Sequence, residues 1–277
     1  MGSAMAARIH GAGFDTILWN RDRAKCEQLA ESLGASAAAS AAEAASKADV
    51  VLTSLADDAA VDHVYLGPEG IAAGAVAVDT STVDPLTVEK VGAAVDAAGA
   101  GFLDCPVSGS VSTVEAGTLT IMAGGDPELV ERVRPVLDAM AARVVHCGGR
   151  GAGSATKLAV NGLVHGLNVA LSESLVLAER AGVDRTTAYE VFANGAGGAP
   201  FVQYKRQAYE HPNETPVAFS LDLVEKDLEL ITGLGERVGA PMRQAATSLD
   251  IVQSAVAAGF GQRDLSAIAV FLREGAG

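Results

Sequence analysis

A strand followed directly by a helix stands at Asp49-Val50-Val51-Leu52-Thr53-Ser54-Leu55-Ala56-Asp57-Asp58, and the same unit recurs on both sides of it. The apolar, β-branched run at 50–53 is typical of a strand that is buried on both faces. Asp57 is a good N-cap for a helix that runs to Leu66. Strand–helix units of this kind are the repeating elements of a parallel sheet.

The alternation extends over the first half of the chain. It predicts further strands at 16–19, 75–79, 118–123 and 143–146, and helices at 23–33, 85–98 and 127–140. The alanine-rich segment 35–48 is also expected to be helical. Such a series predicts an α/β fold with a Rossmann-type, doubly wound parallel sheet.

The pattern changes after Gly149. A long run that is apolar nearly all round, 154–181, predicts a buried helix, and five shorter helical patterns follow at 185–193, 201–209, 221–238, 242–258 and 265–273. We therefore predict two domains: a dinucleotide-binding domain at 1–150 and an all-helical substrate and oligomerisation domain at 151–277.

Composition excludes several classes of protein. A net charge of −14 argues against nucleic acid and anionic membranes as partners. The three cysteines are far apart and the five histidines show no ligand spacing, so we expect neither disulfides nor a metal. No basic-then-apolar leader and no run of about 20 apolar residues stand out. We expect a cytoplasmic protein.

The amino-terminal residues resemble one part of a phosphate-binding turn. Residues 1–9 predict a helix that Gly11 and Gly13 end. In a dinucleotide-binding unit, a strand and two more glycines precede such a helix. We expect the chain to begin inside a Gly-x-Gly-x-x-Gly fingerprint, with Gly2 as the third glycine and the first strand missing.

The end of the strand at 16–19 bears on the cofactor. NAD sites often have an acidic residue at this point, which binds the ribose hydroxyls. This chain has Asn20-Arg21. Arginine cannot accept a hydrogen bond but pairs well with phosphate. We therefore interpret Arg21 as a residue that binds the phosphate of NADP; the alternative is a surface arginine in a turn.

A lysine and an asparagine share one face of the long helix. They lie four residues apart in Gly151-Ala152-Gly153-Ser154-Ala155-Thr156-Lys157-Leu158-Ala159-Val160-Asn161. Lysine is costly to bury without a partner or a role, so Lys157 is the first candidate for chemistry. The alternative is a lysine whose stem lies along an apolar helix flank.

Seven motifs, taken in order, resemble the β-hydroxyacid dehydrogenases. That group contains 3-hydroxyisobutyrate dehydrogenase, tartronate semialdehyde reductase and the glyoxylate/succinic semialdehyde reductases. The resemblance covers nearly the whole chain. It rests on Gly2-Ser3-Ala4-Met5-Ala6, Trp19-Asn20-Arg21, Ser54-Leu55-Ala56, Asp79-Thr80-Ser81-Thr82, Asp104-Cys105-Pro106-Val107-Ser108-Gly109, the stretch 151–161 and Lys226-Asp227-Leu228.

The resemblance implies hydride transfer between NADP(H), or NAD(H), and a small β-hydroxy acid or semialdehyde. It implies that Lys157 is the general acid/base. Substrate-binding residues would be Ser108, Gly109 and Asn161. Cofactor-binding residues would be Gly2, Asn20, Arg21, Leu55, Ala56, Thr82 and Lys226.

Each implied role has an alternative. Asn161 fits a polar contact inside a helix interface, and Ser108-Gly109 an ordinary turn after Pro106. Thr82 fits a helix N-cap, and Lys226 an ion pair with Glu229. Lys157 could act as a base or, when charged, protonate an alkoxide. His165 and Asn168 extend the Lys157 face and are interpreted as interface contacts.

Two further departures from the family pattern concern the substrate, because Ser110 stands where a second glycine is usual and Gly162 where a second asparagine is common. An imine reductase on the same fold and a non-catalytic cofactor-binding scaffold are the alternative functions. The resemblance implies that proteins of both these kinds lack a lysine at the position of Lys157, so the presence of Lys157 argues against both alternatives. A homodimer or homotetramer is expected, because the long apolar helix needs cover.

Overall fold

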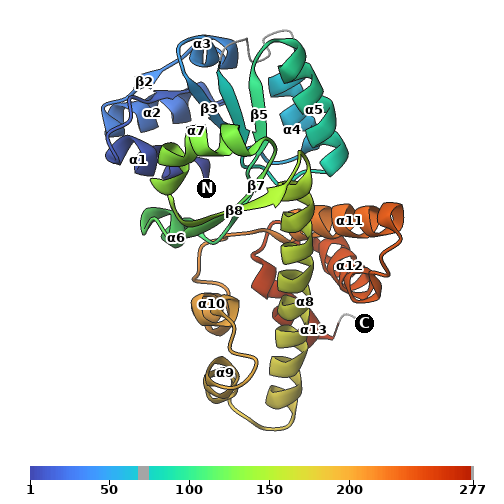
Figure 1. Cartoon of the computed structure of the whole chain (residues 1–277). Helices are drawn as coiled ribbons and strands as arrows, with labels where there is room; N and C mark the ends of the chain where they lie inside the picture. Colours follow the sequence, from blue (N-terminus) through green and yellow to red (C-terminus); the bar gives the residue numbers. More distant parts are fainter. Residues whose placement is uncertain (68–74, 276–277) are drawn as a thin grey trace. The chain divides into compact units, whose positions relative to one another are not determined.

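The computed structural model describes residues 1–67 and 75–275. Two compact units make up the chain, Met1–Lys157 and Leu158–Gly277. The elements of both are labelled in Figure 1. The division lies inside helix α8, Ala152–Arg180, seven residues beyond the predicted boundary. The roles assigned to the two domains remain predictions.

Unit 1 contains a mixed sheet and a small separate one. Strands β3, β4 and β5 run parallel, and β7 then pairs antiparallel with β5 and β6 and parallel with β8. The strands of this sheet are Val50–Thr53 (β3), Val76–Asp79 (β4), Gly101–Asp104 (β5), Val107–Ser108 (β6), Leu119–Gly124 (β7) and Ala141–Gly148 (β8). Strands β1 (Ile17–Leu18) and β2 (Ser36–Ala37) form a parallel pair of their own. The predicted Rossmann-type class is confirmed, but the sheet is not parallel throughout.

Helices cover both faces of the larger sheet. The helices of unit 1 are α1 (Gly2–Gly11), α2 (Arg23–Leu33), α3 (Ala41–Ser46), α4 (Asp58–Leu66), α5 (Pro85–Ala97), α6 (Val111–Glu115) and α7 (Pro127–Asp138), of which α2 packs with the separate pair β1–β2. Val76, Val78 and Leu103 pack with α1 and α7. Ala77 and Phe102, their neighbours along the strands, pack with α4 and α5. Alternate side chains of a strand point to opposite faces, so the sheet is doubly wound.

Four short elements were not predicted. The alanine-rich segment 35–48 contains β2 as well as α3, so the prediction of a helix throughout is wrong. Residues 101–108 contain β5 and β6, and α6 follows. These elements are two to five residues long, and in so short a segment neither the period of 2 nor that of 3.6 can develop.

The regular elements among the described residues of unit 2 are all helices, with one isolated β-bridge between Ser220 and Asp264. After α8 come α9 (Arg185–Asn194), α10 (Pro200–Glu210), α11 (Leu221–Val238), α12 (Arg243–Ala255), a π-helical turn (Val256–Phe260), a 3₁₀ turn (Leu265–Ala267) and α13 (Ile268–Glu274). Their buried side chains form a common core with α8. Leu163 and Leu177 of α8 are 76% and 72% exposed, so the helix is not covered all round in this chain.

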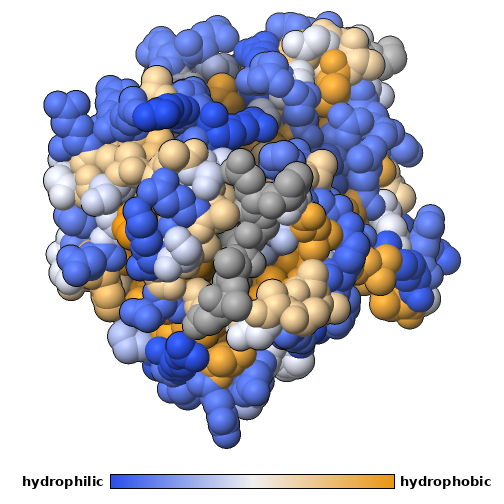
Figure 2. Space-filling view, turned by 90° about the horizontal axis from the view of Figure 1, so that it is seen from above, coloured by the Kyte–Doolittle hydropathy of each residue, from blue (hydrophilic) through white to orange (hydrophobic). Residues whose placement is uncertain are grey.

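The apolar half of the composition lies mainly in these cores. Hydrophilic side chains cover much of the face shown in Figure 2, and hydrophobic ones lie in separate patches between them. Within the described residues, no helix combines the length and apolarity that crossing a membrane requires.

Candidate active site

Three polar residues end neighbouring strands at the same sheet edge. Thr53, Asp79 and Asp104 are aligned by the parallel register of β3, β4 and β5. The carboxyl edge of parallel strands is where ligands bind in open α/β sheets. The predicted cofactor and substrate loops begin immediately after these residues.

A buried hydrogen-bond chain fixes the loops after β3 and β4. The Thr53 hydroxyl donates to Asp79 Oδ1 at 2.7 Å and therefore accepts from the Tyr65 hydroxyl at 2.8 Å. The Ser81 hydroxyl donates to the same Asp79 oxygen at 2.6 Å and accepts from the Leu55 N–H at 2.9 Å. Burial raises the pKa of Asp79, although the bonds from Ser81 and Thr53 oppose this.

These hydrogen bonds hold three predicted cofactor residues close to one sheet edge. Leu55 is bonded directly, Ala56 follows it at an exposed position, and Thr82 follows Ser81. The alternative role for Thr82 is excluded, because Asp84 is the N-cap of α5 and accepts from the Leu86 N–H at 2.8 Å.

Gly2 begins α1 beside the end of β3. A Cβ at this position would lie 3.3 Å from Ser54 Cβ, so a glycine allows the closest approach of helix and loop. The first turn of α1 has no side-chain cap. Unpaired N–H groups at a helix N-terminus favour an anion such as a pyrophosphate.

Asn20 and Arg21 lie in a pocket at the end of β1. The pocket has a volume of about 520 Å³ and is lined by Trp19, Asn20, Arg21, Arg23, Cys26, Glu27, Ala37, Ala38, Ala39 and Glu43. Both of its carboxylates are paired, Glu27 with Arg23 at 2.7 Å and Glu43 with Lys47 at 2.7 Å. Among the described residues, no ion pair is recorded for the exposed Arg21, so its charge is available to an anion.

Asp104 fastens the start of α8 to the end of β5. Its Oδ1 accepts from the Gly151 N–H at 3.0 Å and its Oδ2 from the Ser154 N–H at 2.8 Å. The Ser154 hydroxyl donates to the Val83 carbonyl at 2.7 Å, which ties α8 to the loop after β4 as well. Gly153 allows this approach, because a Cβ there would meet Asp104 and Met122 backbone oxygens.

The environment of Asp104 changes its acidity. Burial raises its pKa to about 6, and the bonds from Ser154 and Gly151 only partly oppose the shift. Lys157 follows one turn after Ser154 and is half-buried. The register of α8 on the sheet edge thus determines where Lys157 lies in unit 1.

The predicted substrate loop contains strand β6. Ser108 pairs with Thr120 of β7, so the alternative, an ordinary turn after Pro106, does not describe residues 107–108. Gly109 has φ +145°, and a Cβ there would lie 2.7 Å from Leu119 Cδ2. Ser110 has φ −113° and, with Thr113, forms the capping box of α6. A second glycine is therefore not required at 110.

In unit 2, Asn161 belongs to a buried cluster around Asp227. The Asn161 amide donates from Nδ2 to Asp227 Oδ2 at 2.6 Å, and His165 Nε2 lies 3.4 Å from the same oxygen. Lys226 Nζ lies 3.1 Å from Asp227 Oδ1. Asn161, His165 and Asp227 are 6%, 2% and 0% exposed.

The charge of Asp227 is stabilised within this cluster. Burial alone would raise its pKa, but hydrogen bonding to His165 and the charges of Lys226 and His165 outweigh burial, so the pKa is lowered. Asp227 is therefore a carboxylate at neutral pH. Lys226, for which an ion pair with Glu229 was the alternative role, contacts Asp227.

The predicted residues thus fall into two groups. Gly2, Leu55, Ala56, Thr82, Ser108, Gly109 and Lys157 belong to unit 1, with Asn20 and Arg21 in the pocket after β1. Asn161 and Lys226 belong to unit 2 and meet at Asp227. The buried carboxylates Asp79, Asp104 and Asp227 were not predicted as site residues, although each lies inside a motif quoted above.

Two family models together match nearly the whole chain. Residues 1–149 match the NAD binding domain of 6-phosphogluconate dehydrogenase, and residues 151–272 match the model described as NAD-binding of NADP-dependent 3-hydroxyisobutyrate dehydrogenase. The chain belongs to the β-hydroxyacid dehydrogenase family. As a member of this family it is an NAD(P)-binding oxidoreductase.

Individual members of the family are similar to this chain over nearly their whole length. The chain is 32% identical to 2-(hydroxymethyl)glutarate dehydrogenase of Eubacterium barkeri, over 97% of this chain and 90% of the relative. It is 34% identical to glyoxylate/succinic semialdehyde reductase 1 of Arabidopsis thaliana, over 97% and 93%. The crystal structure of 3-hydroxyisobutyrate dehydrogenase from Salmonella typhimurium superimposes with a TM-score of 0.90 at 30% identity, over 98% and 95%.

Imine reductases are more distant from this β-hydroxyacid dehydrogenase. The imine reductase from Pseudomonas sp. is 22% identical, with a TM-score of 0.66, over 98% of this chain and 96% of that chain. This likeness shows the shared fold alone.

Proposed function

We propose that the protein transfers hydride between NADP(H) and a small β-hydroxy acid or semialdehyde, with Lys157 as the general acid/base. The observation that carries the proposal is the fastening of α8. Asp104 and Ser154 bind its first turn to the loops at the carboxyl edge of the sheet, and Lys157 lies one turn beyond.

The reaction requires a proton at the substrate oxygen. When bound, the nicotinamide cofactor supplies or accepts the hydride. Lys157 donates a proton to the oxygen as a carbonyl is reduced and accepts it when an alcohol is oxidised. The Asn161 amide orients the substrate one helical turn away. The Ser108 hydroxyl and the Gly109 N–H hold the substrate carboxylate.

The cofactor is proposed to be NADP. Arg21, with no carboxylate partner in the described chain, supports binding of the 2′-phosphate in the pocket after β1. Gly2, Asn20, Leu55, Ala56, Thr82 and Lys226 are the other residues proposed to hold the dinucleotide. The exposed Leu163 and Leu177 of α8 support a homodimer or homotetramer, which light scattering can measure.

Replacing Lys157 with alanine tests the proposal. The protein is given NADPH with glyoxylate, succinic semialdehyde or a cyclic imine, and NADP with 3-hydroxyisobutyrate. The wild type is expected to turn over at least one acid or aldehyde. The K157A variant should lose about 10²–10⁴-fold in kcat, while its Kd for NADPH stays unchanged.

The control is Lys90→Ala, which removes an exposed lysine that pairs with Asp62 at 2.5 Å and should leave kcat unchanged. An unchanged kcat in K157A would remove the proposed role of the lysine. Imine reduction without turnover of any acid or aldehyde would instead favour the imine reductase alternative.

A further inference from the structure

His165 is a buried polar side chain that the proposed reaction does not use. The side chain is 3% exposed, its Nε2 lies 3.4 Å from Asp227 Oδ2, and its Nδ1 has no hydrogen-bond partner among the described residues. A carboxylate can only accept, so Nε2 carries a proton and the ring is a donor to Asp227.

The other side of the ring packs against Phe219. The two ring centroids are 6.0 Å apart and the planes are inclined by 30°. Phe219 lies in the segment before α11, and its backbone N–H donates to Asp264 Oδ2 at 3.3 Å. The position of the phenyl ring therefore depends on how Asp264 is held.

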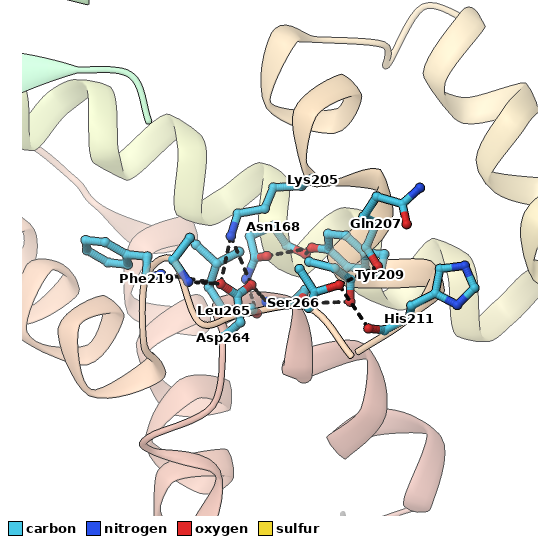
Figure 3. A network of polar contacts seen from close by, with 12 residues as sticks. Asn168, Lys205, Gln207, Tyr209, His211, Phe219, Asp264, Leu265 and Ser266 are labelled. Atoms are coloured by element: carbon cyan, nitrogen blue, oxygen red, sulfur yellow. Dashed lines mark hydrogen bonds and ion pairs between the residues drawn. The ribbon is translucent and has the colours of Figure 1, made fainter. Parts of the chain in front are cut away.

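A second buried ion pair holds Asp264, as Figure 3 shows. Lys205 Nζ donates to both carboxylate oxygens, at 2.9 and 2.8 Å. The Ala218 N–H also donates to Oδ2, at 3.0 Å. Because its charge is paired and both oxygens are hydrogen-bonded, Asp264 fixes the backbone at Ala218 and Phe219, and so keeps the Phe219 ring against His165.

Asn161 and His165 donate to the same oxygen of Asp227. The Asn161 bond, at 2.6 Å, fixes the rotation of the amide, because only its Nδ2 can face a carboxylate. The amide oxygen then points away from Asp227 and remains an acceptor for a substrate hydroxyl. If His165 were replaced by a side chain that cannot donate, the Asp227 carboxylate would lose one of the hydrogen bonds that fix its orientation.

We propose that His165 is a positioning residue: through Asp227 it holds the Asn161 amide in the orientation that binds the substrate. The role rests on the proposed function, in which Asn161 orients the substrate. The effect falls on substrate binding more than on the cofactor, because His165 shares Asp227 Oδ2 with Asn161, whereas Lys226 lies against the other oxygen, Oδ1.

The test compares His165→Leu, which cannot donate, with His165→Gln, whose amide N–H can replace Nε2. The H165L variant should raise the KM for the acid or aldehyde about 3- to 10-fold, the range of one hydrogen bond, with kcat and the Kd for NADPH nearly unchanged. H165Q should restore most of the KM. If H165L does not fold, His165→Met replaces it.

A double-mutant cycle with Asn161→Ala separates positioning from packing. Once Asn161 is removed, H165L should raise KM no further. An unchanged KM in H165L, a failure of H165Q to rescue, or additive effects in the cycle would each overturn the positioning role. A wild type without turnover on any substrate of the panel would overturn the proposed function itself, and the positioning role with it.

Discussion

Replacing Asp104 with asparagine tests the balance between burial and hydrogen bonding at the start of α8. The carboxylate is 1% exposed and accepts two backbone N–H groups. Asparagine has nearly the same shape, cannot ionise and keeps one acceptor oxygen. The D104N variant therefore resembles the protonated form of the wild-type side chain.

The pKa of Asp104 sets the size and sign of the expected effect. Burial raises this pKa from 3.8 to about 6, so the folded protein holds the proton more tightly than the unfolded chain does. The stability that Asp104 contributes is fully present below pH 3.8 and is lost as the pH rises through about 6. A change of this size corresponds to about 3 kcal/mol.

Urea unfolding of both proteins from about pH 4 to pH 8 measures the effect. The free energy of unfolding of the wild type, minus that of D104N, should fall by about 3 kcal/mol over this range. Taking the difference cancels the titration of all other groups. Asp126→Asn, at the exposed N-cap of α7, controls for the loss of a capping carboxylate.

The opposite slope would refute the reasoning. If the wild type gained stability over D104N as the pH rose, the two N–H bonds and the positive end of the helix dipole would outweigh the cost of burying the charge. Asp104 would then anchor α8 best in its ionised form.

Three further changes have expected outcomes. Arg21→Ala should lower the NADP/NAD ratio of kcat/KM about 10- to 100-fold, by loss of a charged contact to phosphate; an unchanged ratio would reject that contact. Gly109→Ala should lower the free energy of unfolding by about 1–3 kcal/mol in urea unfolding and raise the substrate KM. Gly99→Ala, at φ +77° in open space, is its control and should cost less. Lys205→Met leaves Asp264 buried and unpaired and should lower the free energy of unfolding by about 3–5 kcal/mol, whereas a loss below 1 kcal/mol would contradict the importance of this ion pair.

Much of the fold follows from local signals in the sequence. Helix α2 has its predicted bounds because Asp22 caps its start and Gly34, at φ +72°, ends it. Helix α11 likewise begins after Ser220 and ends at Gly239, at φ +71°. Strand β3 is an apolar run between Asp49 and Ser54, and β4 is an apolar run that ends at Asp79; such runs are typical of a buried parallel sheet.

The buried carboxylates of the site could not be predicted in the same way. Asp104 contacts residues 47 and 50 positions later, and Asp227 contacts Asn161 66 positions earlier. An aspartate in a motif is indistinguishable by composition from one in a solvated turn. Its role becomes visible only when the fold brings distant donors to it, so Lys157 could be singled out from its helix but not the residue that fastens that helix.

The unbroken course of α8 makes the number of residues between Lys157 and Asn161 a constraint in its own right. The helix is continuous from Ala152 to Arg180. One inserted residue between the two would turn Asn161 by about 100° and move it about 1.5 Å along the axis, away from Asp227. Loops absorb such insertions, but here a frame-preserving insertion of a single codon would act like a substitution of the asparagine. The relative position of Lys157 and Asn161 is therefore specified by the number of residues between them as much as by their residue types.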